Sequence, residues 1–240
     1  ASPVNRLTNG LVGYWTFDGN DTNWTSATTG TVTDRSPVGT NTGTLTNMSR
    51  TSSPVIGKLG QGMRFESGDY INVGATVSLG NLATKTICAW IYPKSYMHSD
   101  DPSGILTKYV GNPIGWRFFI GNSDAGTNSL YFTQTFTGDN GAWRAQSNPL
   151  NLNSWQHVCV SYDNSSALNT PTFYVNAVPQ TTTMYGTPTL VPDSESGRSL
   201  YIGNLQSDNT WYFDDKLDEV RIYSRILSAD EIKLLYNMGR

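Results

Sequence analysis

Long apolar runs, clustered basic residues and metal-binding histidines are all scarce in this sequence. No apolar stretch approaches the ~18 residues that span a bilayer, so membrane insertion is not expected. Charged residues make up only 15% of the chain, the net charge is −3 and no Lys/Arg cluster occurs, which argues against a nucleic-acid partner. With two histidines and two cysteines, a transition-metal site is not expected either.

Sequence signatures of catalysis are also missing. Glycosidases need two carboxylates on one side of the substrate, about 5 Å apart for retaining chemistry, and acids alternating along a strand would supply them. The adjacent pairs Asp214-Asp215 and Asp218-Glu219 would instead point to opposite faces of a strand. The segment GKLGQG leads into an expected strand and lacks the Lys-Ser/Thr ending of a phosphate loop, so it indicates a turn. These observations favour a protein that is not an enzyme.

Short strands joined by turns dominate the expected secondary structure. The 240 residues include 23 Gly and 11 Pro, with abundant Thr, Asn and Ser, which suits many strands separated by Gly/Asn/Asp turns. The segment TICAWIYP is apolar on both alternating faces, which predicts an interior strand of a two-layer sandwich. The dipeptide Asn176-Ala177 is expected in a hairpin turn. The predicted fold class is therefore all-β, an antiparallel two-sheet sandwich.

One short helix is expected at the C-terminal end of the domain. Ser228 and Glu231 have the spacing of a capping box, in which each side chain bonds the other residue's backbone N–H. The following apolar stripe consists of Ile232, Leu235 and Tyr236. Residues 1–10 are expected as a linker, and residues 11–240 as one domain.

Eight segments occur in an order that is typical of one family. They are GYWTFDGN, GKLGQGMRFESGDYINVG, TICAWIYP, GILTKY, WQHVCVSYDN, TFYVNAVPQ, LYIGN and LDEVRIYSRILSADEI. In this order the chain resembles the laminin-G-like, concanavalin A-like lectin/glucanase jelly-roll domains of secreted and surface proteins over residues 11–237. The resemblance implies two packed antiparallel sheets, one of them concave, with loops at the rims. It also implies a binding module that is often attached to other domains.

A narrower resemblance concerns the two cysteines. TICAWIYP and WQHVCVSYDN are similar to the two pentraxin strands that carry that family's disulfide, which implies a bridge between Cys88 and Cys159. The alternative is two buried free thiols, because cysteine is often buried without a partner. SLYIGN and the polar loop after it resemble the pentraxin calcium-loop region. Asn204, Gln206 and Asp208 are spread out where pentraxins have adjacent ligands, so a pentraxin-type double calcium site is not expected.

The family resemblance also implies a structural calcium ion, which related carbohydrate modules commonly hold between their first and last strands. Calcium takes about 6–8 oxygen ligands. Asp18 ends the first expected strand before the long polar stretch of residues 18–44, and Asp218 lies in the last strand. Asp34 and the backbone carbonyls of residues 41–43 are possible additions. The alternative is that Asp18 caps a turn and Asp218 pairs with an arginine.

Ligand-binding residues are expected among aromatic side chains that neighbour polar ones, because sugars bind by aromatic stacking and a few fixed polar groups. Trp116, if it faces solvent, would stack on a sugar ring, with Arg144, Asp208 or Trp211 fixing hydroxyl groups. Alternation leaves open which face of this strand enters the core: one carries Trp116, Phe118 and Ile120, the other Arg117 and Phe119. If Trp116 is buried, the rim loops around Tyr96 and Trp211 become the better site.

The expected function is that of a non-catalytic, secreted or cell-surface binding or adhesion module. It would recognise a glycan or a surface protein, hold a structural calcium ion and form part of a larger multidomain protein. Two other classes compete with this prediction: a glycoside hydrolase or lyase on the same fold, and a purely structural adhesin or pilus spacer. The missing acid pair argues against the first, and a glycan array would separate the second from a lectin.

Overall fold

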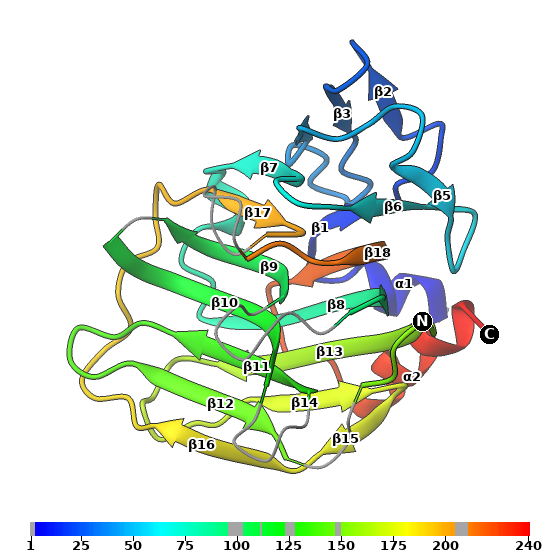
Figure 1. Ribbon diagram of the computed structural model, residues 1–240. Coiled ribbons are helices and arrows are strands. Elements are labelled where there is room, and N and C mark those ends of the chain that lie inside the picture. Colours follow the sequence, from blue (N-terminus) through cyan, green and yellow to red (C-terminus); the bar gives the residue numbers. More distant parts are fainter. Residues whose placement is uncertain (1–2, 96–102, 111, 123–127, 147–149, 205–210) are drawn as a thin grey trace.

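The computed structural model describes residues 3–95, 103–110, 112–122, 128–146, 150–204 and 211–240. In this part of the chain the strands form two antiparallel sheets that pack on each other, and two short α-helices lie near the chain ends (Figure 1). The expected all-β jelly-roll sandwich with one short C-terminal helix is confirmed.

The smaller sheet has eight strands in the described residues and pairs the first strand of the chain with the last. Its order is β15-β14-β13-β8-β18-β6-β5, and β1 pairs with β18 off this path. The strands are β1 (Leu11–Trp15), β5 (Pro54–Ile56), β6 (Gln61–Phe65), β8 (Thr84–Pro93), β13 (Gln156–Asp163), β14 (Thr172–Val175), β15 (Val178–Gln180) and β18 (Asp215–Tyr223). Asn176 and Ala177, with φ of 51° and 64°, form the expected hairpin turn between β14 and β15.

The larger sheet has ten strands among the described residues. Its order is β16-β12-β11-β10-β9-β17-β7-β4-β3-β2. The strands are β2 (Thr22–Trp24), β3 (Gly30–Val32), β4 (Gly43–Thr46), β7 (Tyr70–Gly74), β9 (Ser103–Val110), β10 (Asn112–Asn122), β11 (Asn128–Gln134), β12 (Gly141–Ala145), β16 (Thr182–Gly186) and β17 (Leu200–Ile202). A 3₁₀-helix, η1 (Val77–Leu79), follows β7.

The core lies between the two sheets and follows strand alternation. On β8 it receives Ile87, Ala89 and Ile91, while β10 contributes Trp116, Phe118 and Ile120. All six belong to one buried apolar cluster. The opposite face of each strand is therefore directed away from the core.

Helix α2 (Ala229–Met238) covers the outer face of the eight-stranded sheet. Ser228 and Glu231 form the predicted capping box, and the buried Ile232 and Leu235 pack in a second apolar cluster with Tyr223 and the two cysteines. Cys88 and Cys159 are register partners on β8 and β13 with a Cα–Cα distance of 4.2 Å, and they form a disulfide. The predicted bridge is confirmed.

Two segments are more ordered than the sequence indicated. Within the expected linker of residues 1–10, Pro3–Thr8 forms helix α1, and Leu7 packs against the second cluster, so the packed structure begins before residue 11. Within the polar stretch of residues 18–44, β2 and β3 pair with each other and β3 pairs with β4. Short strands and side-chain hydrogen bonds order this stretch, although its composition gave no strand signal.

Candidate functional site

The outer face of the ten-stranded sheet carries a group of aromatic rings around an arginine, which we call the aromatic platform. Its members are Tyr109 on β9, Arg117 and Phe119 on β10, Tyr131 on β11, Tyr185 on β16, and Trp211 just before β18. Strand alternation explains this set, because Trp116, Phe118 and Ile120 of the same strand enter the core. Phe119 and Tyr131 are also direct register partners on adjacent strands.

The rings of the platform contact one another. Phe119 and Tyr131 stack with centroids 5.3 Å apart, and Tyr131 meets Tyr185 edge-on at 5.6 Å. Trp211 packs against the Phe119–Tyr131 pair. Tyr185 is 52% exposed, so at least one ring of the platform offers a large surface to a ligand.

The guanidinium group of Arg117 lies among these rings. Its Cζ atom is 4.4 Å from the ring centroid of Tyr109 and 5.8 Å from those of Phe119 and Trp211. Burial lowers the pKa of Arg117 from its ordinary value, an effect that the nearby Tyr109 and Tyr185 oppose. The guanidinium stays cationic, because an arginine pKa starts far above neutral pH.

The platform is left uncovered by the helices of the described chain, since α1 and α2 both pack with the eight-stranded sheet. Phe119 and Tyr131 are only 8% and 7% exposed, so they support the platform from below, and Tyr185 is its exposed ring. An exposed aromatic ring with cationic side chains beside it is suited to a flat ligand that has one apolar face and many hydroxyl groups.

The structure separates the four ligand residues predicted from the sequence. Trp116 is only 1% exposed and lies inside the core, so its assignment as a sugar-stacking residue is wrong. Arg144 and Trp211 lie on the outer face, where Arg144 acts electrostatically on Tyr185. Asp208 and Tyr96 lie outside the described residues. Arg117 and Phe119, on the alternative face of the same strand, do lie on the platform, and Tyr131 is the register partner of Phe119 there.

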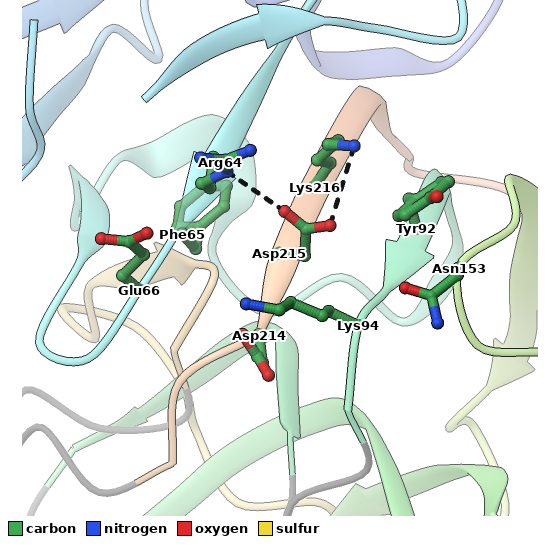
Figure 2. A pocket seen from close by; sticks show the side chains of 9 residues that line it. All are labelled: Arg64, Phe65, Glu66, Tyr92, Lys94, Asn153, Asp214, Asp215 and Lys216. Atoms are coloured by element: carbon green, nitrogen blue, oxygen red, sulfur yellow. Dashed lines mark hydrogen bonds and ion pairs between the residues drawn. The ribbon is translucent and has the colours of Figure 1, made fainter. Parts of the chain in front are cut away.

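A second candidate for ligand binding is a polar pocket of about 270 Å³ at the ends of β6, β8 and β18 (Figure 2). It is lined by Arg64, Phe65, Glu66, Tyr92, Lys94, Asn153, Asp214, Asp215 and Lys216. Asp215 is held by Arg64 at 3.2 Å and by Lys216 at 3.7 Å. Figure 2 shows the Lys94 side chain reaching into the space between Asp214 and Asp215. The pocket has charges of both signs, several of which already compensate one another.

Asp18 and Asp218, the expected calcium ligands, hold the same turn between β5 and β6. Oδ2 of Asp218 accepts hydrogen bonds from the backbone N–H groups of Lys58 and Leu59, at 2.8 and 2.9 Å. Oδ1 of Asp18 accepts one from Gln61 N–H at 2.8 Å. A Cβ atom on Gly60 would lie only 2.2 Å from that Asp18 oxygen, which explains a glycine there. The segment GKLGQG thus forms the predicted turn.

The second oxygen of Asp218 fits a cation. Oδ1 is buried and has no hydrogen-bond partner in the described part of the chain. Burial raises the pKa of Asp218 to about 8, an effect that hydrogen bonds from the backbone N–H groups of Leu59, Lys58 and Glu219 only partly offset. A buried carboxylate oxygen that lacks a donor is stable when it binds a proton or a metal ion.

Asp34 does not fit the calcium set. Its Oδ1 accepts hydrogen bonds from Tyr14 N–H and Ser36 N–H, and its Oδ2 accepts from Ser36 Oγ and Asn41 N–H. The backbone carbonyl of Asn41, a further expected ligand, accepts a bond from the indole of Trp15 at 2.8 Å. Asp34 is therefore saturated by donors and closes the polar stretch of residues 18–44 without an ion.

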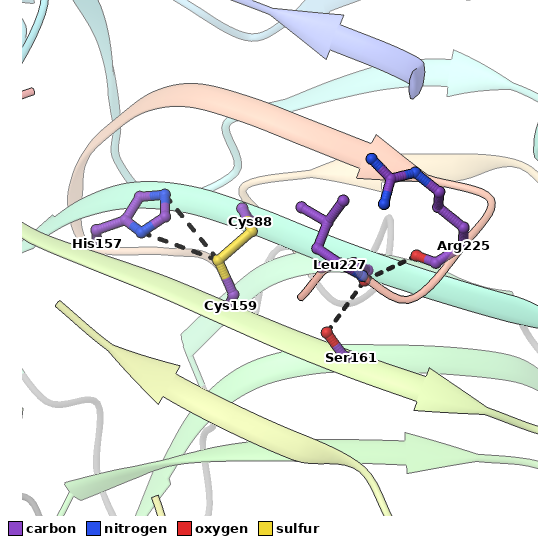
Figure 3. Close-up of a disulfide and its surroundings, with 7 residues drawn as sticks. Cys88, His157, Cys159, Ser161, Arg225 and Leu227 are labelled. Atoms are coloured by element: carbon purple, nitrogen blue, oxygen red, sulfur yellow. Dashed lines mark hydrogen bonds between the residues drawn. A yellow bond between two sulfur atoms is a disulfide. The ribbon is translucent and has the colours of Figure 1, made fainter. Parts of the chain in front are cut away.

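His157 lies beside the disulfide and completes a buried Cys88–His157–Cys159 group (Figure 3). The Sγ atom of Cys159 is 3.9 Å from Nδ1 of His157, and the imidazole ring packs against Trp90 and Tyr236, which stack on each other. Burial lowers the pKa of His157 to about 3, so the ring is neutral. The oxidised sulfurs are not available as thiolate ligands, so the buried His157 is interpreted as a structural residue.

The fold defines a class: a two-sheet jelly-roll module, here with a group of aromatic rings on the outer side of one sheet. A sequence profile described as concanavalin A-like lectin/glucanases superfamily matches residues 65–233, which is more than half of the chain. The chain belongs to this superfamily. No helix in the described residues has the length and apolar character needed to cross a membrane.

Solved structures of binding domains share the fold. The binding domain of Paraclostridial Mosquitocidal Protein 1 aligns with a TM-score of 0.68 and 17% identity, over 97% of this chain and 53% of that one. Domain 4 of AbnA, a GH43 extracellular arabinanase from Geobacillus stearothermophilus, was solved with arabinotriose. It aligns with a TM-score of 0.65 and 18% identity, over 94% of this chain and 98% of that one. The botulinum neurotoxin serotype D ligand-binding domain was solved with N-acetylneuraminic acid. It aligns with a TM-score of 0.66 and 14% identity, over 99% of this chain and 53% of that one.

The chain spans about half the length of the two toxin domains and nearly all of the arabinanase domain. At these identities the similarity establishes the fold alone. No curated protein sequence matches the chain.

Proposed function

We propose that this chain is a non-catalytic carbohydrate-binding module and that the aromatic platform is its sugar-binding face. The observation that carries the proposal is the exposed ring of Tyr185, which packs edge-on against the buried, stacked pair Phe119 and Tyr131. A pyranose or furanose ring has an apolar C–H face that packs on an aromatic ring, while its hydroxyl groups need fixed polar partners. Arg117 and Arg144 supply donors beside these rings.

The setting that we propose is secreted or cell-surface, within a larger protein. A disulfide between core strands is typical of chains that fold in an oxidising compartment. The similar structures are described as binding domains of toxins and as one domain of an extracellular enzyme, which supports a module that brings a larger protein to a glycan or a surface ligand.

The two competing classes are less well supported. For a hydrolase or lyase, the polar pocket of Figure 2 would have to supply the acids, yet Asp215 is engaged by Arg64 and Lys216, and Ser95 Oγ donates to Asp214. For a pure spacer, the exposed ring of Tyr185 and the two arginines that act on it have no structural role to explain them.

Replacement of Tyr185 by alanine is expected to weaken glycan binding about tenfold, or ~1.4 kcal/mol, and to leave the melting temperature nearly unchanged. The reason is that Tyr185 is 52% exposed and lies at the free end of the ring stack. The measurement is isothermal titration with the best sugar from a glycan array. Tyr185→Phe should keep most of the affinity, since it keeps the ring.

Leu168→Ala is the control, because Leu168 is 91% exposed in a loop of the opposite sheet and outside the platform. If Tyr185→Ala binds like the wild type while Asp214→Asn loses binding, the polar pocket is the ligand site instead. If the array shows no specific glycan, the spacer class is favoured and the proposal fails.

We also propose a structural calcium ion held by Asp218 and Asp18 beside the turn of residues 57–61. The unpartnered Oδ1 of Asp218 would be its first ligand, with Asp18 as the neighbouring carboxylate. Bound calcium would neutralise the buried carboxylate of Asp218, which without a metal ion is neutralised by a proton.

Chelation is therefore expected to lower stability by ~2.7 kcal/mol relative to calcium at a hundredfold excess over Kd. The size of the effect depends on pH. In the metal-free fold the pKa of Asp218 is raised to about 8, so the folded state binds the proton of this carboxyl more tightly than the unfolded state does. The resulting contribution to the free energy of unfolding is full below the unfolded pKa of about 4 and is lost as the pH rises through 8. Calcium binds the ionised carboxylate, so calcium stabilises more at pH 9 than at pH 6.

Thermal melts with calcium and with chelator at both pH values measure this effect. Asp218→Asn should abolish the calcium-dependent part of stability and the loss between pH 6 and 9, whereas Asp34→Asn should keep the calcium response. Identical melting curves with calcium and with chelator at pH 9 would refute the site.

A further inference from the structure

Arg117 differs from the other buried cations of the chain in what surrounds it. Arg221 pairs with Glu219, and Lys85 and Lys108 each lie 3.6 Å from an oxygen of Glu195. Arg117 has no such partner: in the part of the chain that the structure describes, none of the carboxylates forms an ion pair with it. Its neighbours are aromatic rings, and its one hydrogen bond runs from Nε to Thr133 Oγ1 at 3.3 Å.

The rings stabilise the cation only in part. The negative faces of aromatic rings attract a guanidinium, which offsets some of the cost of removing it from water. A guanidinium has five N–H donors in a planar fork, however, and rings do not replace oxygen acceptors for them. Burial lowers the pKa of Arg117, which agrees with a cation that lacks an anionic neighbour. The guanidinium N–H groups of Arg117 are thus suited to donate to an oxygen acceptor on a bound ligand.

The position of Arg117 makes such an acceptor part of a ligand. Arg117 is only partly buried, and both Arg117 and Arg144 act on the exposed Tyr185. A sugar stacked on Tyr185 would therefore lie within reach of two arginine side chains. A planar carboxylate, or a sulfate ester, can accept two parallel N–H bonds from one arginine, whereas a sugar hydroxyl cannot.

We propose that the ligand of the aromatic platform is an anionic glycan, whose carboxylate or sulfate group is received by Arg117 while its ring stacks beside it. This inference rests on the proposed carbohydrate-binding function and specifies its ligand class. The affinity should fall as ionic strength rises, because the recognition includes an exposed charge pair.

The test compares charged and uncharged forms of the same polymer by isothermal titration. Polygalacturonic acid and its carboxyl-reduced form test the carboxylate source, and chondroitin sulfate and desulfated chondroitin test the sulfate source. We expect one charged polymer to bind at least ~10-fold tighter than its uncharged form, a difference of about 1.4 kcal/mol. Arg117→Gln should abolish this preference, and Arg117→Lys should keep part of it. Arg50→Gln, at an exposed site away from the platform, should change nothing.

Each outcome has a defined meaning. Equal affinity for the charged and uncharged members of both pairs overturns the inference, as does an unchanged preference in Arg117→Gln. If the melting curve shows that Arg117→Gln does not fold, the inference is judged on the wild type alone. It then stands only if the wild type prefers the charged polymer and this preference falls as the salt concentration rises. Binding of neutral sugars alone, lost in Tyr185→Ala, would keep the carbohydrate-binding function and reject the anionic ligand. Absence of any glycan binding, on the array as well as with these polymers, would reject both.

Discussion

Loss of the Cys88–Cys159 disulfide is expected to lower the free energy of unfolding by about 4 kcal/mol. The two cysteines are 71 residues apart, and a cross-link that closes a loop of this length removes that much conformational entropy from the unfolded chain in loop-closure models. Both residues are buried under helix α2, so the bridge also connects β8 to β13 where the helix packs. The effect is large beside the ~5–15 kcal/mol that stabilises an ordinary domain.

The measurement is urea unfolding of the oxidised protein and of the Cys88→Ala/Cys159→Ala double variant. Alanine is preferred to serine because a buried hydroxyl group without a partner would add its own cost. The wild type unfolded without reductant should show no reactive thiol and, after reduction, two. A difference below ~1 kcal/mol between the two proteins would contradict the expected role of the bridge.

Replacement of Trp116 by alanine should cost about 3–5 kcal/mol of stability, as truncation of a large buried aromatic side chain usually does. Trp116 is 1% exposed and stacks on Phe132 at a centroid distance of 6.4 Å. Its indole N–H has no acceptor among the described residues. Trp116→Phe should therefore be much milder, since it keeps an aromatic ring and removes an unsatisfied donor.

The same two variants separate folding from binding. Urea unfolding measures the stability of each, and glycan titration is done at a temperature where both remain folded. Trp116→Phe should bind sugar like the wild type, because the residue faces the core and not the platform. Strong loss of affinity in a stably folded Trp116→Phe protein would show that this strand presents its other face to the ligand.

The fold could be predicted because its signals are local or depend on order along the chain. The double-sided apolar pattern of TICAWIYP indicated an interior strand, and β8 does lie between β13 and β18. The spacing of Ser228 and Glu231 indicated the helix start, and the capping box is present. Such signals survive without a structure because strand and helix periods are properties of neighbouring residues.

The candidate site could be predicted only in part, because it combines side chains from distant strands. Arg144 and Trp211 were expected and lie on the platform side, but Tyr185 on an edge strand was not expected. The pairing of β16 with β12 brings Tyr185 there, and strand pairing over such distances leaves no mark in a single sequence. The hydrogen bonds of Asp34 could not be predicted for the same reason. Its four donors belong to Ser36 and Asn41 in its own loop and to Tyr14 in the first strand.

By itself the sequence determined the interior strand β8, the C-terminal helix and the all-β class. It also determined the disulfide partners, through their family resemblance, and the alternation that divides Trp116 from Arg117. Only the tertiary structure decided which of those two side chains enters the core. Each face of β10 carries aromatic residues, so the presence of aromatic side chains does not by itself choose the buried face. Pairing with β9 and β11 and packing on the other sheet placed Trp116 inside and left Arg117 on the open face. That choice, made by contacts between distant strands, determines where this protein presents its aromatic platform.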